Sequence, residues 1–381
     1  MSRMVRSVKR LAVLGSTGSI GRQTLDVVRA FPDRFRVVAL ACGNNFPLLV
    51  KQAAEFQPKL VCAAGAREKR RVAGAETGTL EELARHPDVD IVVVATAGKA
   101  GLAPTLAAIR ARKTVALANK EVLVMAGEVV MAEAGRHNAE VRPVDSEHSA
   151  IWQCLRGEEP SAISRLILTA SGGPFRSFSP AELEAVTPAQ ALAHPTWEMG
   201  TKVTVDSSTL MNKGMEVIEA HWLFDVPFDR VDVVIHSRSI VHSIVEFVDG
   251  SSKAQLSMPD MKLPIQYALT YPERWEGPFR PAVDFAGVGA LDFEAVDVGR
   301  FPCLRLAREA GERGGTYPAV LSAADEVAVE LFLAGRIGFT DIARVVAGAL
   351  DGHRAVAHPS LDDILAADAW ARDAVRAGVA G

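Results

Sequence analysis

A glycine-rich turn near the N-terminus limits the folds open to this chain more than any other feature. Residues 15–21 read Gly-Ser-Thr-Gly-Ser-Ile-Gly and lie between the apolar run 11–14 and an amphipathic helical pattern over 22–31. A strand, a glycine turn and a helix in this order leave backbone N–H groups of the helix start pointing at a phosphate. We therefore predict a dinucleotide site; the alternative is a turn that serves only tight packing.

Short apolar runs alternate with helical patterns through the first 150 residues, which predicts a parallel sheet covered by helices. These runs are Leu11 to Leu14, Val37 to Ala41, Ile91 to Ala95 and Thr114 to Leu117. A second set of strand-like segments covers Ile163 to Thr169, Val231 to Ile235, Ser243 to Val248 and Lys253 to Leu256. After about residue 285 Ala-rich helical patterns dominate, and Thr340 and Ser360 resemble helix N-caps. The fold class is α/β with a helical C-terminal domain.

Composition excludes several classes of protein. The 42 basic and 46 acidic side chains give a formal net charge of −4, and the basic cluster Lys69-Arg70-Arg71 is too short for a nucleic-acid track. No apolar run approaches the roughly 20 residues of a membrane span. The four cysteines are scattered without metal-ligand spacing, as in ordinary buried thiols of a reducing compartment. We expect a cytoplasmic protein that binds neither nucleic acid nor membrane.

The end of the second predicted strand bears on which dinucleotide binds. An NAD site usually offers an Asp or Glu there to the ribose 2′-hydroxyl. This chain has Ala41-Cys-Gly-Asn-Asn45 and no carboxylate. The sequence therefore favours NADP over NAD.

Three carboxylates suggest a divalent cation. Asp145 and Glu147 follow a strand-like segment, and extended backbone would project both side chains to one side. Glu216 adds a third, and hard oxygen ligands suit Mg²⁺ or Mn²⁺, with Co²⁺ as a further option. The neighbouring His148 is read as a local structural histidine. For the pair Asp145 and Glu147, the alternative to a metal site is an ordinary solvated turn.

Donors for a phosphate lie near these acids in the sequence. Asn212, Lys213 and Glu216 share one face of a helical pattern, a few residues after Ser207. Ser171 precedes Gly172-Gly173 and forms a possible anion nest. The alternative for the helical face is a surface helix with an ordinary Lys–Glu pair, and the alternative for the Ser171 segment is a plain turn.

Two further segments carry candidate catalytic groups. Lys120 ends the fourth apolar run, at the sheet edge where such folds bind ligands, and a surface lysine is the alternative. His194 and Trp197 lie in the segment 194–200, which has Pro195 and Gly200 as hinges and resembles a lid over the substrate. The alternative is that the indole only covers the core.

Taken in order, these segments resemble the 1-deoxy-D-xylulose 5-phosphate reductoisomerase family. The matching blocks are GSTGSIG, LANKE, VDSEHSAIWQCL, LTASGGPFR, HPTWEMG, VTVDSSTLMNKGMEVIEAHWLF and SMPDMKLPIQYALTYP. The resemblance implies a Rossmann-like NADPH-binding domain (1–150), a central α/β catalytic and dimerisation domain (151–285) with a flap at 194–200, a connecting segment (286–312) and a C-terminal helical bundle (313–381). It also implies a homodimer.

The resemblance further implies metal-dependent rearrangement and NADPH reduction of 1-deoxy-D-xylulose 5-phosphate to 2-C-methyl-D-erythritol 4-phosphate in isoprenoid biosynthesis. Catalytic positions are Lys120, Glu147 and His194, and metal positions are Asp145, Glu147 and Glu216. Substrate positions are Lys120, Ser146, Ser171, His194, Trp197, Ser207, Asn212 and Lys213. NADPH positions are Thr17, Gly18, Ser19, Ile20, Gly43, Asn44, Asn45, Asn119, Glu121 and Gly200.

The chain departs from the family pattern at two places. Asn44 stands where a basic residue is common, and Ser322-Ala-Ala-Asp325 stands where Asn-Ala-Ala-Asn is usual. Two other functions fit part of the sequence: a metal-independent NADP dehydrogenase acting on a semialdehyde, and a dinucleotide-sensing protein without catalysis. Sensitivity to a chelator separates the first from a reductoisomerase, and the lid with its metal site is poorly explained by sensing alone.

Overall fold

A computed structural model describes residues 8–65, 71–193, 199–279 and 282–380. The chain forms two compact units, each built from separated segments. Unit 1 comprises residues 1–122, 130–149 and 260–281, and unit 2 comprises residues 123–129, 150–259 and 282–381. The predicted division into four functional regions stays a prediction.

Unit 1 contains a seven-stranded sheet in the order β4-β3-β2-β1-β5-β6-β7, and every neighbouring pair is parallel. The strands are β1 Lys9–Leu14, β2 Phe35–Cys42, β3 Leu60–Ala63, β4 Glu76–Thr77, β5 Ile91–Val94, β6 Thr114–Leu117 and β7 Val141–Pro143. The chain leaves β1 toward β2 on one side and later returns to β5 on the other. This reversal makes β1 and β5 the switch point, beyond whose carboxyl ends such sheets bind ligands.

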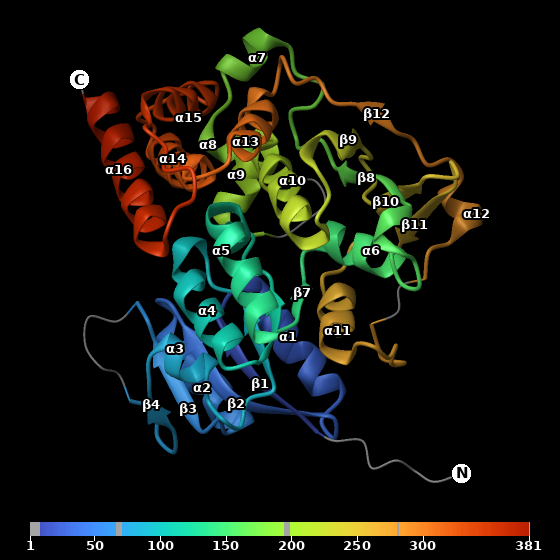
Figure 1. Cartoon of the computed structure of the whole chain (residues 1–381), viewed down its shortest axis with the longest axis vertical. Helices are drawn as coiled ribbons and strands as arrows, with labels where there is room; N and C mark the ends of the chain where they lie inside the picture. Colours follow the sequence, from blue (N-terminus) through green and yellow to red (C-terminus); the bar gives the residue numbers. More distant parts are fainter. Residues whose placement is uncertain (1–7, 66–70, 194–198, 280–281, 381) are drawn as a thin grey trace. The chain divides into compact units, whose positions relative to one another are not determined.

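Helices connect the strands of unit 1 (Figure 1). They are α1 Ser19–Ala30, α2 Phe46–Phe56, α3 Leu80–Ala84, the 3₁₀ turn η1 Gly98–Gly101, α4 Leu102–Arg110 and α5 Glu121–His137, with α11 Lys262–Thr270 contributed from later in the chain. α11 is tied to the sheet because Lys9 Nζ donates to Leu269 O over 2.8 Å and Arg142 donates to Ala268 O over 2.8 Å. α5 is kinked at Ala126, where φ is −143° and ψ is 27°.

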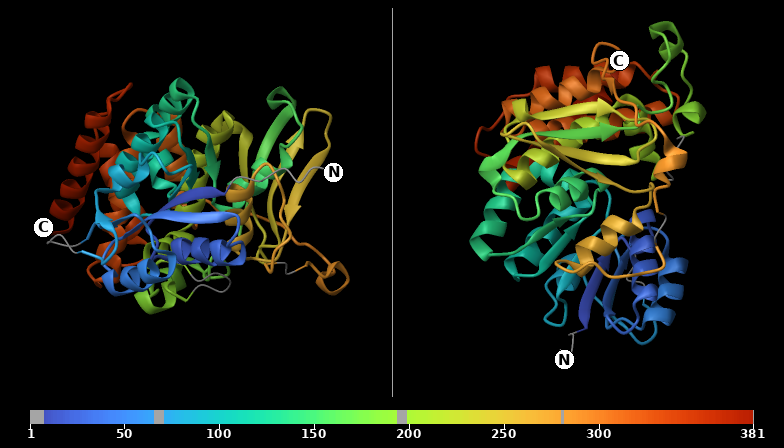
Figure 2. Two further views of the ribbon diagram at one scale, coloured as in Figure 1. Left: turned by 90° about the horizontal axis from the view of Figure 1, so that it is seen from below. Right: turned by 90° about the vertical axis from the view of Figure 1, so that its right-hand side faces the viewer.

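Unit 2 contains a five-stranded sheet in the order β11-β10-β8-β9-β12. The strands are β8 Ile163–Ala170, β9 Val231–Ile235, β10 Val241–Phe247, β11 Ser252–Leu256 and β12 Glu294–Ala295. Within the described strands of this sheet, β8 and β9 pair in parallel and the other pairs are antiparallel. The green and yellow strands of this sheet lie side by side in both views of Figure 2.

Helices make up the rest of unit 2, and many of them share one hydrophobic core with its sheet. They are α7 Pro180–Glu184, α8 Pro188–Ala191, α9 Thr201–Thr209, α10 Met211–Phe224, α12 Phe285–Val288, α13 Pro302–Arg313, α14 Tyr317–Leu333, α15 Asp341–Gly352 and α16 Leu361–Ala380, with 3₁₀ turns η2 Pro160–Ala162 and η3 Phe228–Arg230. α6 Ser146–Cys154 crosses the boundary between the two units. None of the described helices is long and apolar enough to cross a membrane.

The α/β fold class is confirmed, and of the two predicted N-caps one is confirmed and one is corrected. Ser360 caps α16 as predicted: its Oγ accepts from Asp363 N over 3.2 Å, and its own N donates to Asp363 Oδ2. Thr340 stands immediately before α15, but its side chain makes no capping bond. The carboxylate of Asp341 accepts from Gly338 N at that helix start instead.

Candidate active site

The glycine turn after β1 is fixed by steric contacts with backbone. Gly15 has φ +88°, and a Cβ there would lie 2.3 Å from Ala95 O, on the end of the neighbouring strand β5. A Cβ on Gly21 would lie 2.2 Å from Gly15 O, so α1 could not approach the turn as closely. Both contacts involve backbone atoms that cannot rotate away. Glycine is therefore required at the first and third positions of the motif.

The helix α1 begins in the middle of the glycine turn. Gly18 is the N-cap of α1, is exposed and has no side chain to cap the helix, while Thr17, Ser19 and Ile20 are half-buried. Ser16 lies underneath: its Oγ donates to Gln52 Oε1 over 2.7 Å, and Gln52 Nε2 donates to Ser16 O over 2.8 Å. This reciprocal pair ties the turn to α2. The turn thus holds the start of α1 in place, and backbone N–H groups at a helix start are able to bind an anion.

The three residues after β2 are exposed at the same carboxyl edge of the sheet. Asn45 caps α2, because its Oδ1 accepts from Leu48 N over 3.2 Å. Asn44 lies against Gly65, where a Cβ would stand 2.1 Å from Asn44 Oδ1, and a Cβ on Gly43 would meet no atom within 4 Å. Asn45 therefore has a structural role in addition to its predicted cofactor role.

The segment after β6 places three predicted residues in a row. Asn119 is buried, and its Nδ2 donates to Thr96 O over 2.8 Å and Gly98 O over 2.9 Å. These bonds join the loop after β5 to the start of α5, so this amide organises the switch-point edge. Lys120 is largely buried, with its Nζ 2.5 Å from Asp145 Oδ2. Glu121 begins α5 and is half-buried.

The acidic segment after β7 differs from the extended form that its spacing suggested. β7 ends at Pro143 and α6 begins at Ser146, so Glu147 lies in the first turn of a helix. Asp145 Oδ1 accepts from Ser146 N over 2.9 Å, and Ser146 Oγ donates to Glu147 Oε2 over 2.5 Å. The extended-backbone argument was wrong because the helix start, whose N–H groups favour a carboxylate, begins earlier.

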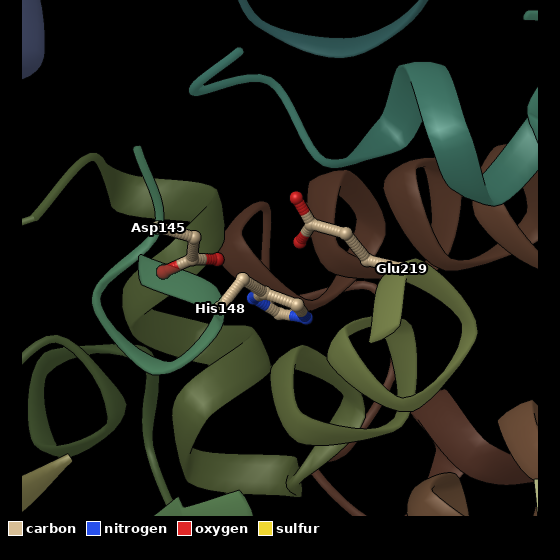
Figure 3. A group of neighbouring side chains, drawn as sticks. All are labelled: Asp145, His148 and Glu219. Atoms are coloured by element: carbon tan, nitrogen blue, oxygen red, sulfur yellow. The ribbon is translucent and has the colours of Figure 1, made fainter. Parts of the chain in front are cut away.

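Asp145 and Glu147 are half-buried and His148 is fully buried. Figure 3 shows Asp145 immediately before α6 and His148 on it; the third side chain drawn there, Glu219, belongs to α10 of unit 2. In unit 1, Asp145 and Glu147 thus supply two carboxylates at one helix start, with Lys120 paired to the first.

The start of α10 carries the donor face predicted from the sequence, and that shared face is confirmed. Glu216 is 1% exposed, and its two oxygens accept from Asn212 Nδ2 and Lys213 Nζ, each over 2.5 Å. A buried carboxylate is thereby held between an amide and an ammonium. Leu210, in the left-handed region at φ 62°, separates α9 from α10 and turns this helix start.

Ser171 and Ser207 come from the end of β8 and the last turn of α9. Gly172 and Gly173 have positive φ of 83° and 67°, and Gly173 N donates to Ser171 Oγ over 3.3 Å. A Cβ on Gly173 would lie 2.9 Å from Ser207 O. The glycines therefore let the turn after β8 lie directly on the end of α9, which brings two predicted phosphate residues together.

The predicted lid is only partly described. His194 and Trp197 lie outside the described residues. Gly200 is the exposed N-cap of α9, and its carbonyl accepts from Thr204 Oγ1 over 3.0 Å. A Cβ there would meet no atom within 4 Å, so local packing does not require this glycine.

Sequence patterns did not reveal two buried polar groups in unit 2. His242 of β10 shares a hydrogen bond of 2.8 Å with Ser257 Oγ; burial lowers its pKa to about 4, and the charge of Lys213 acts in the same direction. Lys202 of α9 pairs with Asp206 over 2.5 Å and with Asp325 of α14 over 2.6 Å. The spacing of Lys202 and Asp206 was a readable signal, but Asp325 is 123 residues away.

Three family models match successive parts of the chain. They are described as "1-deoxy-D-xylulose 5-phosphate reductoisomerase" for residues 11–127, "1-deoxy-D-xylulose 5-phosphate reductoisomerase C-terminal domain" for residues 141–224 and "DXP reductoisomerase C-terminal domain" for residues 256–374. The chain is 54% identical to the 1-deoxy-D-xylulose 5-phosphate reductoisomerase of Shouchella clausii, over 97% of this chain and all of the relative. It is also 54% identical to the 1-deoxy-D-xylulose 5-phosphate reductoisomerase of Pelotomaculum thermopropionicum, over 96% of this chain and 97% of that relative.

Solved structures agree with these relatives. A crystal structure of DOX-P reductoisomerase in complex with NADPH, fosmidomycin and magnesium has a TM-score of 0.91 and 41% identity, covering 98% of each chain. The 1-deoxy-D-xylulose 5-phosphate reductoisomerase of Zymomonas mobilis in complex with NADPH has a TM-score of 0.89 and 42% identity, covering 98% of this chain and 99% of that one. On this likeness over nearly its whole length, the chain belongs to the 1-deoxy-D-xylulose 5-phosphate reductoisomerase family.

Proposed function

We propose that this chain converts 1-deoxy-D-xylulose 5-phosphate to 2-C-methyl-D-erythritol 4-phosphate, with NADPH and a divalent cation, as a step of isoprenoid biosynthesis. The observation that carries the proposal is the full-length likeness to reductoisomerases, including one whose solved complex holds NADPH, fosmidomycin and magnesium. This likeness favours the reductoisomerase over a metal-independent dehydrogenase and over a dinucleotide sensor.

The glycine turn of unit 1 fits the pyrophosphate of NADPH. The N–H groups from Thr17 to Ile20 lie at an uncapped helix start, and side chains at positions 15 and 21 would fill the space that the turn needs. Gly43, Asn44, Asn45, Asn119, Glu121 and Gly200 complete the proposed set. NADPH supplies the hydride, and this chain orients it. Asn44 is exposed and residues 41–45 contain no carboxylate, which favours NADPH over NADH.

Three carboxylates fit a hard divalent cation. We assign Asp145 and Glu147 of unit 1 and Glu216 of unit 2 as its ligands, since an all-oxygen set suits Mg²⁺, Mn²⁺ or Co²⁺ better than a thiolate site would. When bound, such a cation stabilises developing negative charge on substrate oxygens as a Lewis acid. Lys213 and Asn212 hold the Glu216 carboxylate in place, and Lys120 holds that of Asp145.

The substrate phosphate is assigned to the donors of unit 2. Ser171, Ser207, Asn212 and Lys213 offer two hydroxyls, an amide and an ammonium, and the contact of Gly173 with Ser207 O brings the two serines together. A phosphate accepts several such bonds at once, and charge-assisted ones are strongest. His194 closes this set, and Trp197 excludes water over the bound substrate.

Near the reacting carbons, Lys120 and Ser146 are the remaining donors. Lys120 is largely buried beside Asp145, where an ammonium stabilises negative charge that develops on a substrate oxygen. Ser146 Oγ donates to Glu147 and keeps that carboxylate in one orientation. We therefore assign Lys120, Glu147 and His194 as the catalytic residues.

The function is tested by incubating the protein with 1-deoxy-D-xylulose 5-phosphate, NADPH and Mg²⁺, while the absorbance of the reduced nicotinamide is followed and the product is identified by mass spectrometry. The proposal requires loss of absorbance that depends on both the substrate and Mg²⁺. Oxidation of NADPH that persists after EDTA treatment would instead support a metal-independent dehydrogenase.

Two further assignments accompany this function. We propose a homodimer, as the family resemblance implies, and sedimentation velocity measures it directly. We also propose a cytoplasmic location: all four cysteines are buried thiols, as suits a reducing compartment.

A further inference from the structure

A buried charge cluster links α9 to α14 within unit 2. Lys202 Nζ lies 2.5 Å from Asp206 Oδ2 on its own helix and 2.6 Å from Asp325 Oδ2 on α14. Asp206 is 2% exposed and Asp325 is 0% exposed. The fold itself does not require charges at this position, since an apolar contact could join the same two helices.

The charges balance if the cluster keeps one proton. Two ionised carboxylates and one ammonium would leave a buried net charge of −1, which is strongly unfavourable. The Oδ1 atoms of Asp206 and Asp325 are both buried and accept no hydrogen bond within the described part of the chain. Burial, and next the charge of Asp325, raises the pKa of Asp206 well above its usual range. Asp206 is therefore the carboxyl that keeps a proton.

The same helix presents Ser207 to the turn after β8. Asp206 and Ser207 are adjacent, and the backbone of Ser207 and Ser208 lies 2.9 to 3.1 Å from a Cβ built on Gly173. The turn at Gly173 and the end of α9 are too close to admit even a methyl group between them. A shift of α9 along α14 would therefore move Ser207 relative to Ser171. The polar tie that opposes such a shift starts from Lys202, near the beginning of α9, which bonds both to Asp206 on the same helix and to Asp325 on α14.

We propose that Lys202, Asp206 and Asp325 are positioning residues for the phosphate end of the substrate, because with one shared proton they form a neutral buried clamp that fixes α9, and with it Ser207, on α14. This inference rests on the proposed function, in which Ser207 binds that phosphate. The clamp touches neither substrate nor cofactor and acts through the placement of α9.

Two substitutions of Asp325 test the clamp. Asp325→Asn keeps the shape, and its amide N–H can replace the shared proton toward Asp206. Asp325→Leu removes the tie to α14 but leaves Lys202 and Asp206 as a neutral pair, so it avoids stranding a charge. The matched control is Asp368→Leu: Asp368 is also 2% exposed and pairs with Arg372, which reaches Glu326, so this pair ties α16 to α14.

The readouts are KM and kcat for 1-deoxy-D-xylulose 5-phosphate, and the Kd of inorganic phosphate from thermal-shift titration. Asp325→Leu should raise both KM and the phosphate Kd about tenfold, with kcat within about threefold and NADPH affinity unchanged. Asp325→Asn should stay within about twofold of the unsubstituted protein in all of them. Asp368→Leu should lower Tm without changing the phosphate Kd.

A lower Tm of Asp325→Leu with unchanged KM and phosphate Kd would show a purely structural cluster and overturn the clamp. The clamp would also be overturned if Asp325→Asn raised KM and the phosphate Kd as much as Asp325→Leu does. It would be overturned as well if phosphate did not raise the Tm of the unsubstituted protein. If Asp325→Leu does not fold, Lys202→Met is measured in the same way. Phosphate binding with no turnover of 1-deoxy-D-xylulose 5-phosphate would refute the proposed function and still test the clamp.

Discussion

Substitution of Gly21 by alanine tests whether the glycine turn is the NADPH site. The added Cβ would lie 2.2 Å from Gly15 O and 2.5 Å from Ser16 Cα, and both are backbone atoms. Ordinary van der Waals contacts of a Cβ begin at about 3.4 Å. The start of α1 must therefore move away from the turn by about 1.2 Å (3.4 minus 2.2). Overpacking of this kind costs about 1–3 kcal/mol of stability.

A displacement of this size also breaks phosphate contacts. A hydrogen bond of about 2.9 Å that lengthens by about 1.2 Å no longer qualifies as one. Each bond to a charged group contributes about 1.5–3 kcal/mol, so the loss of one weakens NADPH binding about tenfold or more. We expect the Kd of NADPH to rise accordingly, while the affinity for inorganic phosphate at the donors of unit 2 stays unchanged.

The Kd is measured by fluorescence titration of NADPH, alongside Tm. Gly135→Ala is the control, because a Cβ there meets no atom within 4 Å and alanine is the better helix former on α5. It should leave the Kd unchanged and stabilise the protein slightly. Unchanged NADPH affinity in a destabilised Gly21→Ala variant would refute the assignment of the turn. A Gly21→Ala variant as stable as the unsubstituted protein would refute the steric argument.

Two further predictions concern unit 2. Glu216→Gln should lower kcat at least about 100-fold, because a Lewis acid contributes several kcal/mol and each 1.36 kcal/mol is tenfold in rate. Ser207→Ala should mainly raise KM, because this serine is assigned to bind the phosphate. Steady-state kinetics that show the reverse ranking would reject both roles. His242 is neutral in the folded state with a pKa of about 4, against 6.5 ordinarily. The unfolded chain therefore binds the proton first, and the free energy of unfolding should fall by about 3 kcal/mol between pH 6.5 and 4; urea titrations of His242→Asn should lack this loss, and an equal loss would contradict the cause.

The sheet of unit 1 was predictable where a run of mostly apolar residues marks a strand between helical patterns. The run Thr114 to Leu117 coincides with β6, and Leu11 to Leu14 lies within β1. β3 and β4 were missed, and β7 was recognised only as a strand-like segment before Asp145; β4 and β7 span two and three residues, too few for a pattern to show. β4 and β7 are the edges of the sheet and β3 lies next to β4, and these places follow from pairing with neighbours, which no local window records.

The candidate site was predictable where its residues are close in the sequence. The face formed by Asn212, Lys213 and Glu216 follows from helical spacing alone. The form of the Asp145 segment did not follow, because a short strand gives way to a helix within two residues. The tie from Lys202 to Asp325 depends on tertiary packing across 123 residues, which spacing cannot report.

The central claim is that Asp145, Glu147 and Glu216 hold one divalent cation, and titration with Mn²⁺ followed by electron paramagnetic resonance tests it most directly. The proposal predicts one tightly bound Mn²⁺ per chain, with affinity lost in each of Asp145→Asn, Glu147→Gln and Glu216→Gln while the variants stay folded. Mn²⁺ binding that survives any one of these substitutions at full affinity would contradict it.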